Sequence, residues 1–172
     1  MIRSAVATIT LITIVLLLGC KHEATPEETT LTVIGNPAPV FSVTTLDGEI
    51  FDLSEQRGTV VLVNFWATWC PPCREEIPHL EAEVWQRFKD RGLTMIAISR
   101  EENEETVRPF VDANSMSFPV AIDPDRGIFG QYAESFIPRN IVIGKNGEVL
   151  FQSSGYDAEE FAQMIERIEQ AL

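Results

Sequence analysis

The stretch TVVLVNFWATWCPPC (residues 59–73) decides the fold. Its first part is a nearly unbroken apolar run that follows Gly58, and such a run is typical of a strand buried on both faces of a parallel sheet. The stretch ends in two cysteines, Cys70 and Cys73, which are separated by two prolines. The sequence therefore predicts a central strand that leads directly into a cysteine pair.

A helix and a second strand follow the cysteine pair. Residues 75–91 carry apolar side chains at spacings of three and four and are followed by Gly92, as in an amphipathic helix that ends at a glycine. Pro78 lies inside this helix and is expected to bend it. Residues 93–98 form another apolar run, so the unit predicts two parallel strands joined by a right-handed crossover.

Two further elements are predicted around this unit. On its N-terminal side, Asp47-Gly48 joins two short apolar stretches, which is typical of a tight β-hairpin. On its C-terminal side, residues 104–115 predict a helix. This helix belongs to a segment, residues 104–133, that we expect to be inserted between the two halves of the sheet.

The last third of the chain predicts antiparallel strands. Residues 140–143 and 148–151 are mostly apolar and flank Asn146-Gly147, a strong hairpin signal. Asp157 begins a capping box that opens a final helix. The expected fold class is therefore α/β, with a central mixed sheet flanked by helices, an N-terminal β-hairpin and a central helical insertion.

The first residues of the chain are typical of a targeting segment. Arg3 precedes an uncharged and strongly apolar run whose length suits a signal peptide better than a membrane span. The run ends in LLGC (residues 17–20), which resembles the bacterial motif whose cysteine receives lipid and becomes the new N-terminus. We therefore expect residues 1–19 to be a signal peptide and Cys20 to carry a lipid anchor. The alternative is an uncleaved anchor helix beside an incidental cysteine, and both readings place the domain outside the cytoplasmic membrane.

The segment after the anchor differs in composition from the domain that follows. Residues 20–34 are mostly polar and acidic and show no apolar periodicity, so we expect the lipidated cysteine to be followed by a flexible tether. Residues 35–172 then form one globular domain, which agrees with a chain of 172 residues.

Charge and composition exclude several classes of protein. The chain has 13 Lys and Arg against 26 Asp and Glu, a net charge of -13, so the phosphate backbone of a nucleic acid would repel it. Three cysteines are too few for a disulfide-stapled scaffold, and with two histidines they do not readily supply a four-ligand zinc site. We therefore expect no nucleic-acid partner, no metal and no cofactor, and any cysteine chemistry has to come from one pair.

The two cysteines are expected to differ chemically. Cys70 stands where the strand gives way to the helix, so its sulfur is expected on an exposed edge at the positive end of the helix, with Cys73 about one turn inside. Cys70 is then the thiolate that attacks a substrate disulfide, and Cys73 resolves the mixed disulfide. Because Pro71 and Pro72 lack N–H groups, fewer donors stabilise the thiolate, which favours a reductant over a strong oxidant.

Two other interpretations of the pair remain open. It could be half of a zinc site, but the two further ligands would have to be His22 and His79, one in the tether and the other along the same helix. It could also be a purely structural disulfide, but so short a loop stabilises a fold very little. Both interpretations are weaker than redox chemistry.

The segment FWATWCPPCREEIP (residues 65–78) is similar to the active-site segment of thioredoxin-like proteins of the TlpA/ResA type, which include membrane-tethered reductases of cytochrome c maturation. GNPAPVF (residues 35–41) resembles the N-terminal hairpin of that family, and the insertion 104–133 resembles its extra helix. The resemblance covers nearly all of residues 35–172 and implies a thioredoxin-like fold.

The resemblance also implies a substrate-binding surface around the sulfurs. It places Pro138 at the cis-proline of the family, which faces the two cysteines and leaves the backbone of Ile137 free to pair with a substrate strand. It places Trp69 on the active-site surface, where Pro71 and Pro72 also contact substrate. The family usually continues after this proline with two small residues such as threonines, whereas this chain has Arg139-Asn140, so the substrate preference is left open.

Glu76 is the third residue expected to take part in the chemistry. It lies three positions after Cys73, on roughly the same helical face, and matches a buried glutamate of the family. A carboxyl group buried there would have a raised pKa and could exchange protons with the resolving thiol. The alternative is an ordinary solvated glutamate, as Glu75 is expected to be. Thioredoxin itself has an aspartate beneath the cysteines, but Asn64 stands at the matching position here and cannot take a proton.

Together these features predict an exported, lipid-anchored thiol-disulfide oxidoreductase that faces the periplasm or the cell exterior. We expect a monomer that reduces disulfides in exported proteins, with apocytochrome c as one candidate, and that is recharged by a membrane thiol electron donor. One alternative is a thiol peroxidase, which would need a Thr/Cys pocket with an activating arginine. The other is a copper chaperone of related fold, which would need a C-x-x-x-C motif and a distant histidine, and no histidine follows His79.

Overall fold

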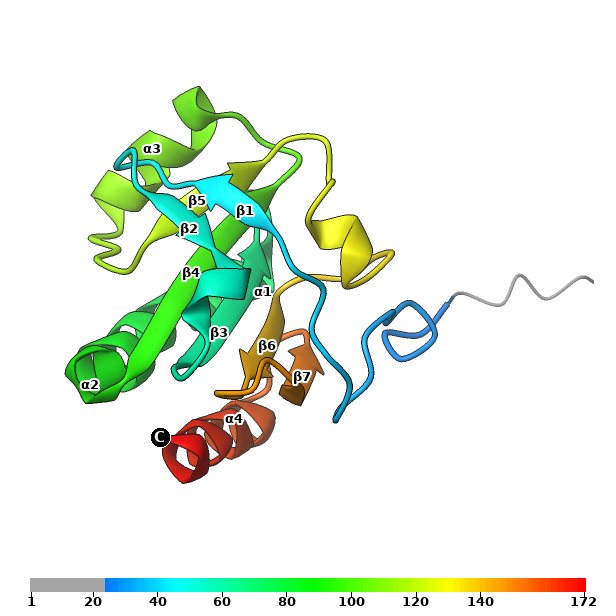
Figure 1. Cartoon of the computed structure of the whole chain (residues 1–172). Helices are drawn as coiled ribbons and strands as arrows, with labels where there is room; N and C mark the ends of the chain where they lie inside the picture. Colours follow the sequence, from blue (N-terminus) through cyan, green and yellow to red (C-terminus); the bar gives the residue numbers. More distant parts are fainter. Residues whose placement is uncertain (1–23) are drawn as a thin grey trace, which may run out of the picture.

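The centre of the molecule is a five-stranded mixed sheet with the strand order β5-β4-β3-β6-β7 (Figure 1). The computed structural model describes residues 24–172, so the expected signal peptide and Cys20 lie outside the described residues. The strands of the sheet are β3 (Val60–Trp66), β4 (Leu93–Arg100), β5 (Val120–Asp123), β6 (Arg139–Ile143) and β7 (Val149–Ser154).

The strand predicted to be central is the middle strand of the sheet. β3 pairs in parallel with β4, in a register that runs from Val60 opposite Leu93 to Trp66 opposite Ser99. On its other side β3 pairs antiparallel with β6, and β6 pairs antiparallel with β7. The predicted mixed sheet is therefore confirmed, and the change from parallel to antiparallel pairing lies between β3 and β6.

The helices differ from the predictions mainly around Pro78. They are α1 (Pro71–His79), the π-helical segment η2 (Leu80–Trp85), α2 (Gln86–Phe88), α3 (Glu104–Ala113), α4 (Ala158–Ala171) and the short 3-10 helices η1 (Leu53–Gln56), η3 (Lys89–Arg91) and η4 (Phe129–Gln131).

The helix expected over residues 75–91 begins earlier, at Pro71, because a proline in the first turn needs no N–H partner. Just after Pro78, where we expected a bend, the helix changes to π geometry; the proline lacks an N–H and so interrupts the regular hydrogen-bond pattern. Within residues 24–172, none of the helices is long and apolar enough to cross a membrane.

Each face of the sheet has its own core. Alternate residues of β3 point to opposite faces, so Leu62 and Trp66 pack with side chains from α1, α3 and α4. Val63 and Phe65 pack on the other face, against the N-terminal hairpin and η4. The strand is buried at every position, which explains why its sequence is a continuous apolar run.

The predicted N-terminal hairpin consists of β1 (Ser42–Thr44) and β2 (Ile50–Asp52), which pair antiparallel. N-terminal residues also contact both outer strands of the main sheet. Thr45 forms an antiparallel bridge with Ala121 in β5. Gly35 and Asn36 exchange backbone hydrogen bonds with Val149, the first residue of β7.

Residues 24–34 differ from the flexible tether expected for residues 20–34. Thr29 and Thr32 are buried. The Thr30 backbone forms an antiparallel bridge with Ala133, and the Thr32 hydroxyl donates a hydrogen bond to the Gln152 side chain. Polar composition suggested a free segment, but its hydroxyl and backbone groups have partners on the domain.

Truncation of Leu62 is expected to destabilise the protein strongly. Its side chain is fully buried at the centre of β3, and removing it to alanine leaves a cavity that should cost about 2–5 kcal/mol of unfolding free energy. Ile50→Ala is the control, because Ile50 is 77% exposed and its truncation should change stability by less than about 0.5 kcal/mol. Urea denaturation of both variants measures the difference, and equal midpoints would contradict the position of β3 in the core.

Candidate active site

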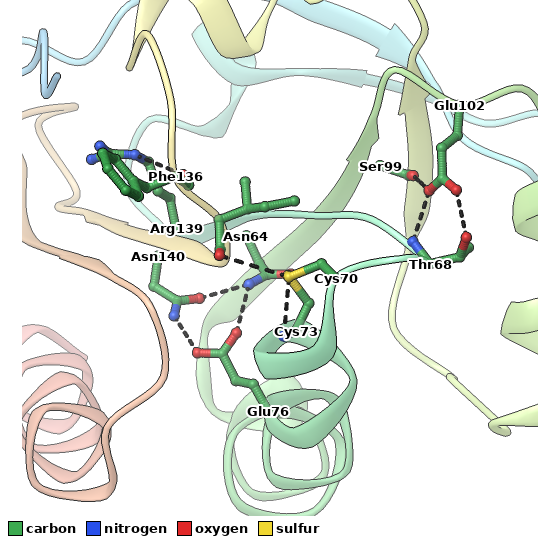
Figure 2. The surroundings of a disulfide bond; sticks show 11 residues. Asn64, Thr68, Cys70, Cys73, Glu76, Ser99, Glu102, Phe136, Arg139 and Asn140 are labelled. Carbon is green, nitrogen blue, oxygen red and sulfur yellow. Dashed lines mark hydrogen bonds between the residues drawn. A yellow bond between two sulfur atoms is a disulfide. The ribbon is translucent and has the colours of Figure 1, made fainter. Parts of the chain in front are cut away.

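Cys70 and Cys73 form a disulfide where β3 gives way to α1 (Figure 2). Cys70 is the N-cap residue of α1, and the Cys73 N–H donates to Cys70 Sγ at 3.2 Å. The positive end of the helix and this N–H both favour negative charge on the Cys70 sulfur. The donor is supplied by Cys73 itself, because the two intervening prolines have no N–H.

The Cys70 sulfur is less exposed than the sequence suggested. Cys70 is only 3% exposed and Cys73 is fully buried, so the expected exposed edge at Cys70 is wrong. The reason is the loop that precedes β6, since the Ile137 carbonyl oxygen lies 3.7 Å from Cys70 Sγ. Two large apolar side chains near this covered disulfide are exposed, Trp69 at 56% and Phe136 at 40%.

The residues assigned to the substrate-binding surface do lie around the disulfide. The Ile137–Pro138 peptide bond is cis, as the resemblance implied. Pro71 is exposed beside Trp69, Pro72 and Ile137 are half-buried, and Pro138 is buried. Cys70 Sγ is therefore covered by the Ile137 carbonyl group, while the residues on either side of Cys70 in the chain, Trp69 and Pro71, are exposed.

Glu76 is buried beneath the disulfide on α1, with only 1% of its surface exposed. Its two carboxyl oxygens accept hydrogen bonds from the side-chain amides of Asn140, at 2.5 Å, and Asn64, at 3.2 Å (Figure 2). Burial raises the pKa of Glu76 to about 8, although the two amide donors act in the opposite direction. Glu75, its neighbour, is exposed as expected.

Asn140 was missed as a partner of Glu76. The sequence showed it only as a departure from the family pattern, whereas in the structure it also accepts a hydrogen bond from Asn64 at 2.9 Å. Asn64 and Asn140 stand directly opposite each other in the antiparallel pair of β3 and β6. The alternation of side chains along both strands would have placed them on one face once that pairing was known.

A second buried carboxylate, Glu102, was also missed. It follows the end of β4, and it accepts hydrogen bonds from the Thr68 N–H at 2.8 Å and from the Ser99 hydroxyl at 2.6 Å (Figure 2). It thus holds the turn that precedes Trp69 and Cys70. The carboxyl ends of the parallel strands β3 and β4 meet at one edge of the sheet. The position of Glu102 just after β4 could therefore have indicated that it lies near the cysteine pair, which follows β3.

A zinc site at the cysteine pair would need further ligands near the two sulfurs. Within residues 24–172, no group of three or more His, Cys, Asp or Glu side chains is arranged to hold a metal ion. His79 Nδ1 lies 2.7 Å from a carboxylate oxygen of Glu83, away from the sulfurs along the helix.

Residues 34–152 match the model of the AhpC/TSA family. The chain belongs to this family. It is 38% identical over 127 residues to "Thiol-disulfide oxidoreductase ResA" of Bacillus thuringiensis (strain Al Hakam), which covers 74% of this chain and 73% of the relative.

Solved structures agree with this relationship. A proposed protein disulfide isomerase from Bacteroides thetaiotaomicron superposes with a TM-score of 0.80 and 35% identity, covering 84% of this chain and 92% of the other. A proposed thiol:disulfide interchange protein DsbE from Chlorobium tepidum gives a TM-score of 0.72 and 27% identity, covering 81% and 98%. The thioredoxin-like fold and the ResA-type resemblance are therefore confirmed, and the chain is a thiol-disulfide oxidoreductase. The names of these relatives favour this activity over the peroxidase alternative.

Proposed function

We propose that the protein reduces disulfides in exported proteins through a cycle between Cys70 and Cys73. The observation that carries this proposal is the placement of Cys70 as the N-cap of α1, between the exposed residues Trp69 and Pro71. An exposed apolar rim beside a reactive sulfur suits a polypeptide substrate.

The cycle transfers two electrons to the substrate. The Cys70 thiolate attacks one sulfur of the substrate disulfide, which forms a mixed disulfide and expels the other substrate sulfur as a thiolate. The Cys73 thiolate then attacks Cys70 Sγ and expels the second substrate thiolate, leaving the Cys70–Cys73 disulfide seen here. An external thiol donor has to reduce this disulfide before the next cycle.

Glu76 is the proton carrier in this proposal. The resolving step requires Cys73 to lose its proton inside a buried site. A carboxylate with a pKa near 8 has a proton affinity close to that of a thiol, so it is suited to accept this proton and return it. Asn64 and Asn140 orient its oxygens.

Glu76→Gln is expected to slow disulfide exchange by about a hundredfold, the lower end of the usual contribution of a general base, while leaving the fold intact. The wild-type rate should vary with pH between about pH 6 and 9, around the pKa of Glu76, and the variant should lose this component. Stopped-flow reduction of a model disulfide measures both. If Glu76→Gln exchanged disulfides at the wild-type rate across this pH range, the result would count against the role of Glu76.

The proposed location rests on the N-terminal sequence, and the proposed partners rest on the family resemblance. We propose that residues 1–19 are a signal peptide, that Cys20 carries the lipid anchor, and that the domain faces the periplasm or the cell exterior. The electron donor is then a membrane thiol protein, and apocytochrome c is a candidate substrate. Labelled fatty acid incorporated by the wild type, but not by Cys20→Ala, tests the anchor.

The substrate is best identified by trapping it. In Cys73→Ala the attack by Cys70 still occurs, but the mixed disulfide persists because no resolving thiol is present. We expect disulfide-linked complexes with exported proteins on non-reducing gels, and mass spectrometry then identifies the partner. Cys70→Ala/Cys73→Ala is the matched control and should trap nothing, and equal complexes in both variants would contradict the proposed cycle.

A further inference from the structure

Arg139 is a buried cation that the proposed chemistry does not use. It follows the cis-proline directly and is only 2% exposed. Within residues 24–172, no carboxylate lies at ion-pair distance from it, and its hydrogen bonds go to carbonyl and hydroxyl oxygens. A buried charge needs such partners, so the position of this side chain depends on them.

The partners of Arg139 come from two separate segments. Its Nε donates to the carbonyl oxygens of Ser135 and Phe136, at 3.0 and 3.1 Å, just before the Ile137–Pro138 bond. Its two terminal nitrogens donate to the N-terminal segment: Nη1 to the Thr30 hydroxyl at 2.7 Å, and Nη2 to the Thr29 hydroxyl at 2.9 Å. Nη2 also donates to a third acceptor in this segment, the Pro26 carbonyl oxygen, at 3.1 Å. One side chain thus joins the N-terminal segment to the loop beside the disulfide.

A second, independent connection joins the same two regions through the backbone. The Leu31 N–H donates to the Tyr132 carbonyl oxygen at 2.9 Å, and the Glu134 N–H donates to the Thr29 carbonyl oxygen at 2.8 Å. The N-terminal segment is therefore paired with the residues that lead into the 135–138 loop. We refer to residues 26–31 together with Arg139 as the N-terminal clamp.

The clamp contacts a stretch of backbone in a rarely occupied conformation. Phe136 has a φ of 64°, in the left-handed region that bulky residues rarely occupy. Its carbonyl oxygen is fixed by Arg139, and the next residue, Ile137, places its own carbonyl oxygen beside Cys70 Sγ. Figure 2 shows Arg139 and Phe136 on the Asn140 side of the cysteines.

We propose that the N-terminal clamp is a positioning device for polypeptide substrates. It fixes Phe136 and the Ile137 backbone, the wall against which a substrate chain lies, and Arg139 is the positioning residue that connects them. It contributes nothing to sulfur exchange itself. This inference rests on the proposed reduction of protein disulfides and adds a requirement for the segment that precedes the domain.

The test compares a protein substrate with a small one. In the full-length chain, Thr29→Val/Thr30→Val removes two acceptors of Arg139 while keeping the side-chain shape. We expect the KM for insulin reduction to rise about tenfold with kcat nearly unchanged, the pattern of lost substrate positioning. Reduction of 5,5′-dithiobis(2-nitrobenzoate), which has no polypeptide to align, should change by less than about twofold.

Matched variants separate positioning from general damage. Thr32→Val removes another buried hydroxyl of the same segment, but one that contacts Gln152 and not Arg139, so it should leave both substrates unaffected. Thr29→Ser/Thr30→Ser keeps both hydroxyls and should restore the insulin KM. The single variants Thr29→Val and Thr30→Val should show the same selective rise at smaller size, which keeps the test valid if the double variant does not fold.

The outcomes distinguish this inference from the function on which it rests. If Thr29→Val/Thr30→Val lost activity equally towards insulin and the small disulfide, or left the insulin KM unchanged, the positioning role of the clamp would be overturned. A wild-type protein that reduces the small disulfide but not insulin would overturn the proposed function instead.

Discussion

Replacing Cys70 with serine is expected to abolish turnover, with a loss of at least about a thousandfold, because a serine hydroxyl does not form the nucleophilic anion at neutral pH. Cys73→Ser should behave differently. It retains the attacking thiol, so it should consume about one equivalent of substrate disulfide in a burst and then stop as a mixed disulfide. The structure gives the reason for the asymmetry, since Cys70 accepts the N–H of Cys73 at the helix start and Cys73 is completely enclosed.

Single-turnover measurements without added reductant check this difference. Mass spectrometry should find the substrate adduct on Cys73→Ser and none on Cys70→Ser. The reverse pattern would exchange the roles of the two cysteines. An external dithiol must be left out, because it would release the adduct and hide the missing resolving step.

Glu76→Gln is expected to change how stability depends on pH. The pKa of Glu76 is about 8 in the folded protein and near the ordinary glutamate value of 4.5 in the unfolded chain. Below about pH 4.5 both states are protonated, and Glu76 then contributes no pH-dependent term. As the pH rises from about 4.5 towards 8, Glu76 loses its proton in the unfolded chain but keeps it in the folded protein, so the free energy of unfolding falls. Above pH 8 Glu76 is ionised in both states, and the free energy of unfolding stays at this lowered value.

The size of this effect makes it measurable. The shift predicts that the stability of Glu76→Gln relative to wild type increases by about 4 kcal/mol between about pH 5 and pH 8.5. Chemical denaturation of the oxidised proteins at both pH values measures it, since the disulfide keeps the thiols from titrating. Comparing the two pH values cancels any fixed cost of placing an amide next to Asn64 and Asn140.

Glu75→Gln is the matched control for this experiment. Glu75 is the exposed neighbour of Glu76, so its substitution should change stability by less than about 0.5 kcal/mol at either pH. If the stability curves of wild type and Glu76→Gln run parallel over the whole range, the carboxyl group of Glu76 is not held protonated by burial.

The central parts of the fold could be predicted because their signals are local. The apolar run of β3, the glycine after the following helix and the turn at Asn146-Gly147 each identify an element within a few residues. The cysteine pair was found for the same reason. The π-helical segment after Pro78 was not predicted, because the sequence indicates that a proline disturbs a helix but not which geometry replaces it.

The rest of the site depends on contacts between distant residues. The loop that covers Cys70 comes from a position 67 residues later, so the sequence alone left this sulfur on an exposed edge. Asn140 reaches Glu76 across 64 residues, and Arg139 holds Thr30 across 109. The burial of Glu76 was expected only through the family resemblance, and the polar composition of residues 24–34 gave no sign that their hydroxyls surround a buried arginine.

The bridges that N-terminal residues make to β5 and β7 bear on the tendency of the protein to aggregate. An outer strand with a free row of backbone donors and acceptors invites intermolecular strand addition, which leads to aggregation. Here the bridge between Thr45 and Ala121 includes a hydrogen bond from the Leu46 N–H to the Val120 carbonyl oxygen of β5, and Gly35 and Asn36 pair with Val149 of β7. The first residues of the domain thereby cover part of each outer strand and hinder strand addition by another copy of the protein.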